Sequence, residues 1–133
     1  MINQINVGVI GTGWCGGIRA NACAENPLVD KLYIAENNKN RLQELKKSLE
    51  LENATDNWNE LIDDKNIDTI IISATPETTH FPMALAALKA GKNVFLEKPI
   101  ATSLKEAEEL IEVSIKNNVK FTIGYSQRFN SKY

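Results

Sequence analysis

Residues 11–16 read Gly-Thr-Gly-Trp-Cys-Gly and directly follow an apolar run at 5–10. Three glycines at this spacing allow a tight turn, a close backbone approach to a ligand, and close packing of a following helix on a strand. The free N–H groups at the start of such a helix bind phosphate oxygens. We therefore predict a dinucleotide-binding loop formed by Gly11, Thr12, Gly13, Trp14, Cys15 and Gly16.

An acidic residue, Glu36, stands 20 residues after Gly16, at the end of a second apolar run at 31–36. A carboxylate at this distance accepts hydrogen bonds from the hydroxyls of the adenosine ribose. Its negative charge repels the 2′-phosphate of NADP, so the sequence favours NAD and makes NADP the weaker candidate. Lys39 and Arg41 follow closely and would soften that preference.

Two more loops follow apolar runs at 68–73 and 93–96. The first contains Ala74, Thr75 and Pro76 and leads to His80, and the second is Glu97-Lys98-Pro99. Because ligands of open parallel sheets bind beyond the carboxyl ends of the strands, we expect both loops to meet the glycine loop. There the Lys98 ammonium would offer three donors to an alkoxide-like oxygen.

Several residues at these loops allow two interpretations. His80, the only histidine, is either a general acid or base or, as we prefer, a residue that shapes the cofactor loop by hydrogen bonding. Glu97 either lines the cofactor or forms an ion pair with Lys98. A single histidine without a cysteine cluster predicts no metal site. Cys15 and Cys23, eight residues apart on one helix, are expected to be free thiols.

The framework that must hold these loops alternates strands and helices. Strands are expected at 5–10, 31–36, 68–73, 93–96 and 119–123, and a helix between each pair. This alternation predicts an α/β fold, a Rossmann-type doubly wound parallel sheet with helices on both faces in three layers. The expected helix starts are an Asn38 cap, capping boxes at Asn57/Glu60 and Ser103/Glu106, and Pro76 in a first turn. The last helix is expected to bury Leu104, Ala107, Leu110, Ile111 and Ile115.

The composition excludes other classes. A net charge of −2 over 133 residues leaves no basic surface for nucleic acid and no polybasic cluster for a membrane. No apolar run approaches the ~20 residues that a membrane span needs. The amino end lacks the features of a signal peptide, so a cytoplasmic location is the default expectation.

The run Ala74-Thr75-Pro76-x-x-x-His80, followed by Ala90-Gly91-Lys92-Asn93-Val94-Phe95-Leu96-Glu97-Lys98-Pro99, resembles the Gfo/Idh/MocA oxidoreductases. That family includes glucose-fructose oxidoreductase and inositol dehydrogenase. The closing Gly124-Tyr125-x-x-Arg128-Phe129 is similar to the family's exit from its first domain. The resemblance implies hydride transfer between nicotinamide and a secondary alcohol or ketone of a sugar or cyclic polyol.

The resemblance also implies roles for single residues. It makes Lys98 the residue that hydrogen-bonds the reacting region of the substrate. It places Thr75 and Pro76 along the nicotinamide ribose and Glu97 beside that ribose and ring. The family's acid–base aspartate and histidine belong to a second domain, so His80 does not correspond to the catalytic histidine.

The same resemblance implies a division of the chain. Residues 1–123 would form the NAD(P)-binding Rossmann domain, and 124–133 would begin the connection to a C-terminal substrate domain that is absent. We then expect dinucleotide binding without turnover, by a monomer or weak dimer. The alternatives are a stand-alone NAD-binding or sensing protein and a domain for another nucleotide such as S-adenosylmethionine, in which Glu97-Lys98-Pro99 has no evident purpose.

Overall fold

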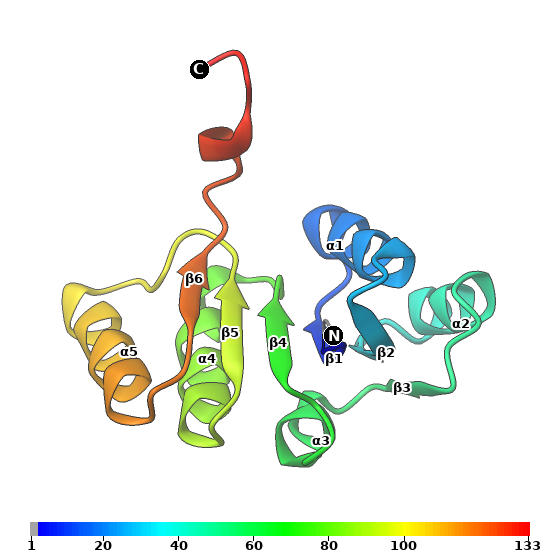
Figure 1. Cartoon of the computed structure of the whole chain (residues 1–133), viewed down its shortest axis with the longest axis horizontal. Helices are drawn as coiled ribbons and strands as arrows, with labels where there is room; N and C mark the ends of the chain where they lie inside the picture. The colour runs from blue at the N-terminus through cyan, green and yellow to red at the C-terminus, as the bar shows by residue number, and fades with distance from the viewer. Residues whose placement is uncertain (1–2) are drawn as a thin grey trace.

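The computed structural model describes residues 3–133, which form a six-stranded sheet with helices on both faces (Figure 1). Met1 and Ile2, the first residues of the domain expected over 1–123, lie outside the described residues. The strand order is β3-β2-β1-β4-β5-β6, and all neighbours are parallel. Strands β2 and β3 extend the sheet on one side of β1, and β4, β5 and β6 extend it on the other side. The switch point between β1 and β4 is where open parallel sheets bind ligands. The predicted Rossmann-type fold is confirmed.

The elements have the following bounds within residues 3–133. The strands are β1 (Ile5–Ile10), β2 (Val29–Ala35), β3 (Asn53–Thr55), β4 (Thr69–Ile72), β5 (Asn93–Leu96) and β6 (Phe121–Ile123). The helices are α1 (Trp14–Glu25), α2 (Lys39–Ser48), α3 (Trp58–Asp63), α4 (His80–Lys89) and α5 (Leu104–Lys116). Short 3-10 turns cover Glu77–Thr79 and Ser126–Phe129.

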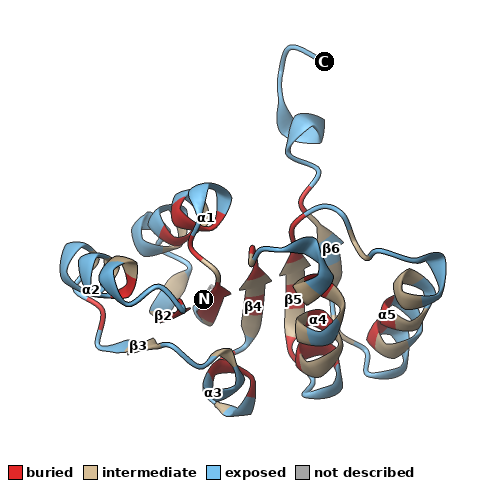
Figure 2. Cartoon of the chain, turned by 180° about the vertical axis from the view of Figure 1, so that it is seen from behind, coloured by how far each residue is buried: buried red, intermediate tan, exposed pale blue. Residues whose placement is uncertain are grey.

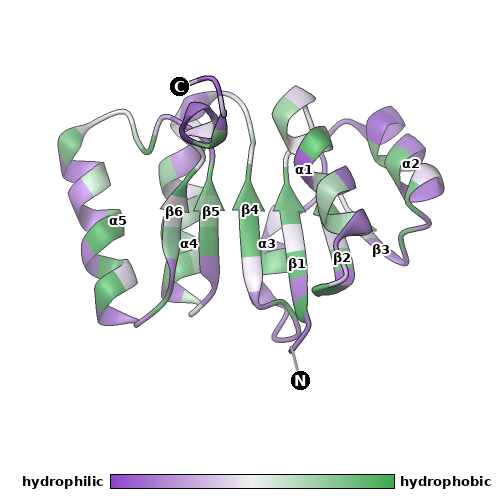
Figure 3. Cartoon of the chain, turned by 45° about the horizontal axis from the view of Figure 1, so that its top comes forward, coloured by the Kyte–Doolittle hydropathy of each residue, from purple (hydrophilic) through white to green (hydrophobic). Residues whose placement is uncertain are grey.

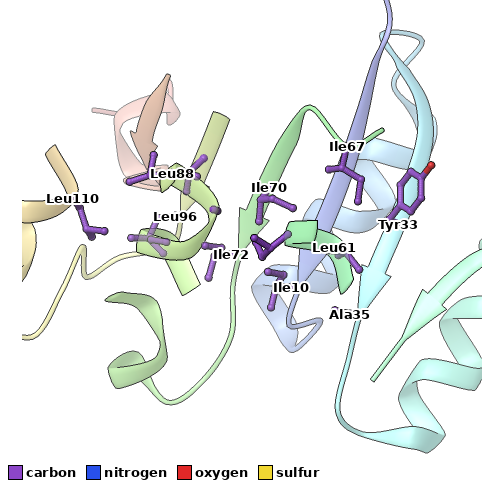
Figure 4. Packing of buried hydrophobic residues seen from close by; sticks show 14 residues of the cluster. Ile10, Tyr33, Ala35, Leu61, Ile67, Ile70, Ile72, Leu88, Leu96 and Leu110 are labelled. Atoms are coloured by element: carbon purple, nitrogen blue, oxygen red, sulfur yellow. The ribbon is translucent and has the colours of Figure 1, made fainter. Parts of the chain in front are cut away.

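Each face of the sheet carries its own hydrophobic core. Successive strand residues point to opposite faces, so Ile70 and Ile72 pack in one core while Ile71 packs against the other. The larger core lies against α3, α4 and α5, where Leu88 and Leu110 are fully buried (Figure 4). The smaller core joins β1 and β2 to α1 and α2 and contains Val7, Val9, Ala20, Ile34, Leu42 and Leu51.

Some expectations about the elements were wrong. Strand β3 was not expected, because three residues that pair only with β2 are too short to show a period. The helix expected to start at Pro76 begins at His80 instead. Pro76 is extended, and its carbonyl accepts from the Thr79 N–H in a tight turn (3.0 Å) before the α-helix begins.

All three expected residues cap their helices, but neither expected capping box is complete, because the Glu106 carboxylate accepts from Thr102 and not from the Ser103 N–H. The Asn38 side chain accepts from the Arg41 N–H at 3.1 Å, and the Ser103 hydroxyl accepts from the Glu106 N–H at 3.2 Å. Asn57 instead accepts from the Asn59 N–H, and its own N–H donates to the Thr55 hydroxyl. The capping box expected between Asn57 and Glu60 is therefore not formed.

Helix α5 buries a narrower stripe than its sequence suggested. Leu110 is fully buried, but Leu104, Ile111 and Ile115 are 75%, 46% and 73% exposed. The reason is position: α5 packs mainly against α4 at the β6 edge, where one face is covered and the opposite face meets no other element (Figure 1). The expected burial of these three side chains was wrong.

The last ten residues leave the body of the domain. Beyond β6 the chain rises past the carboxyl ends of the strands, and residues 125–133 are exposed throughout (Figure 2). Their aromatic side chains Phe129 and Tyr133 are 79% and 92% exposed. Over residues 3–133, no helix combines the length and apolar character needed to cross a membrane.

Candidate functional site

Backbone hydrogen bonds bring the three predicted loops together at the carboxyl edge of the sheet. The Gly11 N–H donates to Ala35 O, the Ser73 N–H to Ile10 O, and the Glu97 N–H to Ile72 O, each at 2.9 Å. These bonds continue the strand ladders by one residue, so the loops leave the sheet side by side. Figure 3 shows β1, β4 and β5 ending at this edge, with the start of α1 above it.

The glycine loop is tightly packed at Gly11 and Gly16 and open at Gly13. Gly11 has a φ of +80°, and a Cβ there would lie 2.6 Å from the Ala74 Cα. A Cβ on Gly16 would lie 1.9 Å from the Gly11 carbonyl oxygen. A Cβ on Gly13 would meet nothing within 4 Å among residues 3–133. Gly13 is the N-cap of α1 and has no side chain to cap it, so the first-turn N–H groups fit an anionic ligand.

Glu36 directly follows β2 and is turned toward the glycine loop. It is 8% exposed, and its Oε2 accepts from the Thr12 N–H at 2.9 Å and from the Thr12 hydroxyl at 2.5 Å. Its Oε1 accepts from the Asn38 N–H at 2.9 Å, which leaves that oxygen room for a further donor. Burial alone would raise the pKa of Glu36, but these hydrogen bonds and the Arg41 charge hold it below its ordinary value. The carboxylate is therefore ionised at neutral pH.

Arg41 lies across the same loop from the α2 side. Its Nε is 3.3 Å from the Thr12 hydroxyl oxygen, and its Nη2 is 3.4 Å from the Gly13 carbonyl oxygen. A fixed cation thus stands beside the Glu36 carboxylate at the outer end of the loop.

His80 stands between the other two loops. Its ring is 2% exposed, with Nδ1 2.8 Å from the Pro99 carbonyl oxygen and Nε2 3.1 Å from the Ala74 carbonyl oxygen. The buried ring is thus placed to hold the loops relative to each other.

Glu97 is buried, whereas its neighbour Lys98 is exposed. Glu97 forms its ion pair with Arg19 of α1, so the alternative of an ion pair with Lys98 is wrong. The Lys98 backbone N–H donates to Glu97 Oε2 at 3.2 Å. The peptide bonds before Pro76 and Pro99 are both cis. In the loop after β4, Thr75 and Pro76 are exposed and Ala74 is half-buried.

A small cavity lies between the glycine loop and the Ala74–Thr75 loop, and the Glu97-Lys98-Pro99 loop is not part of its lining. The cavity has a volume of about 110 Å³, and its lining includes Gly11, Glu36 and Thr75, together with Trp58 and Met83. The sequence did not indicate the last two. Trp58 lies on α3 and Met83 on α4, and only the fold brings these two helices to this edge. Trp14, by contrast, is 84% exposed on the glycine loop.

A larger cavity, which we call the amino-end cavity, lies at the opposite edge of the sheet. Its volume is about 350 Å³, and its lining includes Cys23, Lys31 and Leu49. Burial raises the pKa of the Cys23 thiol, and the Arg19 charge opposes this. Cys15 is exposed, and both cysteines are free as expected. None of the three predicted loops reaches this cavity, so its greater size does not make it the candidate site.

The strand order, the glycine loop at the switch point and the acidic residue after β2 define a dinucleotide-binding α/β domain. Residues 5–125 match the model of the oxidoreductase family with an NAD-binding Rossmann fold, GFO_IDH_MocA. The chain belongs to this family.

Similar proteins include two bacterial inositol dehydrogenases. The chain is 35% identical over 97% of its length to the myo-inositol 2-dehydrogenase of Thermotoga maritima and covers 38% of that protein. It is 30% identical to the NAD(+)-dependent scyllo-inositol 2-dehydrogenase of Bacillus subtilis. That match covers all of this chain and 39% of the Bacillus protein. The chain therefore spans about two-fifths of the length of these two relatives.

A solved structure supports the same assignment. The scyllo-inositol dehydrogenase of Lactobacillus casei, with bound NAD(H) and scyllo-inositol, superposes with a TM-score of 0.90 at 28% identity. The match covers 98% of this chain and 39% of that one.

Proposed function

We propose that this chain is the NAD-binding part of an oxidoreductase that moves hydride between nicotinamide and a carbinol carbon of a sugar or cyclic polyol. The observation that carries the proposal is the convergence of the three loops on one edge of the sheet. Family membership and the polyol dehydrogenases among the relatives support the chemistry. Residues 1–123 would form the cofactor domain, and 124–133 the start of a connection.

Different residues at this edge would contact different parts of the cofactor. The first-turn N–H groups of α1 and the glycine loop would hold the pyrophosphate. Glu36 would accept from a ribose hydroxyl through Oε1 and favour NAD over NADP, with Arg41 weakening the preference. The loop of Ala74, Thr75 and Pro76 would lie along the nicotinamide ribose. His80 would act only by positioning that loop, because its buried ring faces two carbonyls.

Lys98 is the residue of this chain that would reach the substrate. Bound NAD would supply the hydride acceptor, and the exposed Lys98 ammonium would donate a hydrogen bond to the substrate oxygen as charge develops on it. The proton of that hydroxyl also needs an acceptor. His80 is buried and Glu97 is held by Arg19, so neither is placed to take it. We therefore propose that the 133-residue chain binds the cofactor without turning substrate over.

Tryptophan fluorescence separates this proposal from that of a domain for S-adenosylmethionine. Trp58 lines the cavity and Trp14 lies on the glycine loop, so NADH should quench emission saturably while S-adenosylmethionine should not. The Trp58→Phe variant should retain NADH binding by calorimetry and lose part of the quenching. Saturable quenching by S-adenosylmethionine alone, or by neither compound, would refute the proposal.

A further inference from the structure

Arg19 joins the glycine-loop helix to the loop that carries Lys98. It lies in the second turn of α1, and its Nη2 donates to Glu97 Oε1. Its guanidinium carbon stands 4.6 Å from the centroid of the Phe95 ring on β5. The ring and the carboxylate together fix a side chain that would otherwise have several rotatable bonds.

The ion pair is enclosed by three separate parts of the chain. The side chains of Arg19 and Glu97 are 23% and 10% exposed. A Cβ on Gly124, just after β6, would lie 3.0 Å from Glu97 Oε1 and 3.1 Å from Arg19 Nη2, so the pair packs closely against the chain at this glycine. Removing one partner of such a pair leaves an uncompensated buried charge, which is strongly unfavourable.

The second oxygen of Glu97 extends this link to Lys98. Oε2 accepts from the Lys98 backbone N–H at 3.2 Å, so Arg19 holds the carboxylate and the carboxylate holds the loop. Without Arg19 the charged carboxylate would turn toward water and release that N–H. Glu36, Thr12 and Gly13 take no part in these contacts, so the adenosine side of the site would keep its geometry.

We propose that Arg19 is a positioning residue for the Glu97-Lys98-Pro99 loop, which it sets relative to the pyrophosphate-binding helix through Glu97. This rests on the proposed function, since the loop affects binding only if the nicotinamide half of a dinucleotide lies beside it. The expected consequence is a split between two ligands. Binding of NADH depends on Arg19, and binding of ADP, which lacks the nicotinamide half, does not.

The test is calorimetric titration of the 133-residue chain with NADH and with ADP. Arg19→Met should raise the Kd for NADH about tenfold and change that for ADP by less than about twofold. Arg19→Lys should restore part of the NADH affinity. Glu97→Gln should resemble Arg19→Met, and the double variant should be no worse than the poorer single one. The amide signal of Lys98 in a ¹⁵N-correlation spectrum should shift in Arg19→Met.

The control is Lys116→Met, which removes one exposed positive charge at the far end of α5 and should change neither Kd. Equal loss of NADH and ADP binding in Arg19→Met, or unchanged NADH binding, would overturn the inference. Should Arg19→Met not fold, Arg19→Lys and Glu97→Gln carry the same comparison. A parent chain that binds neither ligand would instead refute the proposed function.

Discussion

Replacing Gly16 with alanine should destabilise the domain by about 3 kcal/mol or more and abolish NADH binding. The added Cβ would lie 1.9 Å from the Gly11 carbonyl oxygen, which is backbone and cannot rotate away. The start of α1 must therefore lift from β1, and the N–H groups proposed to hold the pyrophosphate move with it. Urea denaturation followed by circular dichroism measures the stability, and calorimetry measures the binding.

Gly13→Ala is the matched control, because it adds the same methyl group to the same loop. Gly13 has a φ of −55°, and no atom of residues 3–133 would lie within 4 Å of the added Cβ. Stability should change by less than about 1 kcal/mol. The methyl group would nevertheless occupy the space open to the pyrophosphate, so NADH affinity should fall about tenfold or more. Normal NADH binding by Gly13→Ala would contradict a phosphate site at this loop.

Replacing Glu36 with glutamine should reverse or erase the preference for NADH over NADPH. The carboxylate would lose a charge-assisted hydrogen bond to the ribose, worth about 1.5–3 kcal/mol, or roughly 10- to 100-fold in NADH affinity. NADPH should lose less, or gain, because repulsion of its 2′-phosphate disappears while Arg41 remains beside the site. The ratio of the two Kd values is the quantity to measure.

Two controls accompany the Glu36 experiment. Glu112→Gln removes an exposed carboxylate of α5 and should leave the ratio unchanged. Burial alone would raise the pKa of Glu36, but its hydrogen bonds and the Arg41 charge lower it below its ordinary value. The stability that the ionised carboxylate contributes is therefore lost only as the pH falls through that lowered pKa. The contribution of Glu36 to NADH affinity should therefore stay constant from about pH 6 to 8. An unchanged ratio in Glu36→Gln would show that Glu36 does not contact the ribose.

The sequence was sufficient for the framework because the framework follows from local patterns. Continuous apolar runs such as Ile70–Ile72 mark buried parallel strands, and the glycine spacing marks the turn into α1. These local patterns did not predict strand β3 or the correct start of α4. One is an edge strand held by β2 alone, and the other is delayed by a 3-10 turn after Pro76.

The candidate site was only partly predictable. The three loops and their residues could be read from strand ends, since a parallel sheet must bring these ends to one edge. Long-range partners could not. Nothing in the sequence around Arg19 indicates that Glu97, 78 positions away, accepts its hydrogen bond. Trp58 and Met83 reach the cavity from separate helices for the same reason.

Mapping bound NAD⁺ on this chain by ¹⁵N-correlation NMR would locate the cofactor site. The cofactor should shift the amide signals of the glycine loop, Glu36, the Ala74–Thr75 loop and Glu97–Lys98, and leave those of α5 in place. Shifts confined to the amino-end cavity around Cys23, Lys31 and Leu49, or no saturable shifts, would contradict a cofactor site at the carboxyl edge of the sheet.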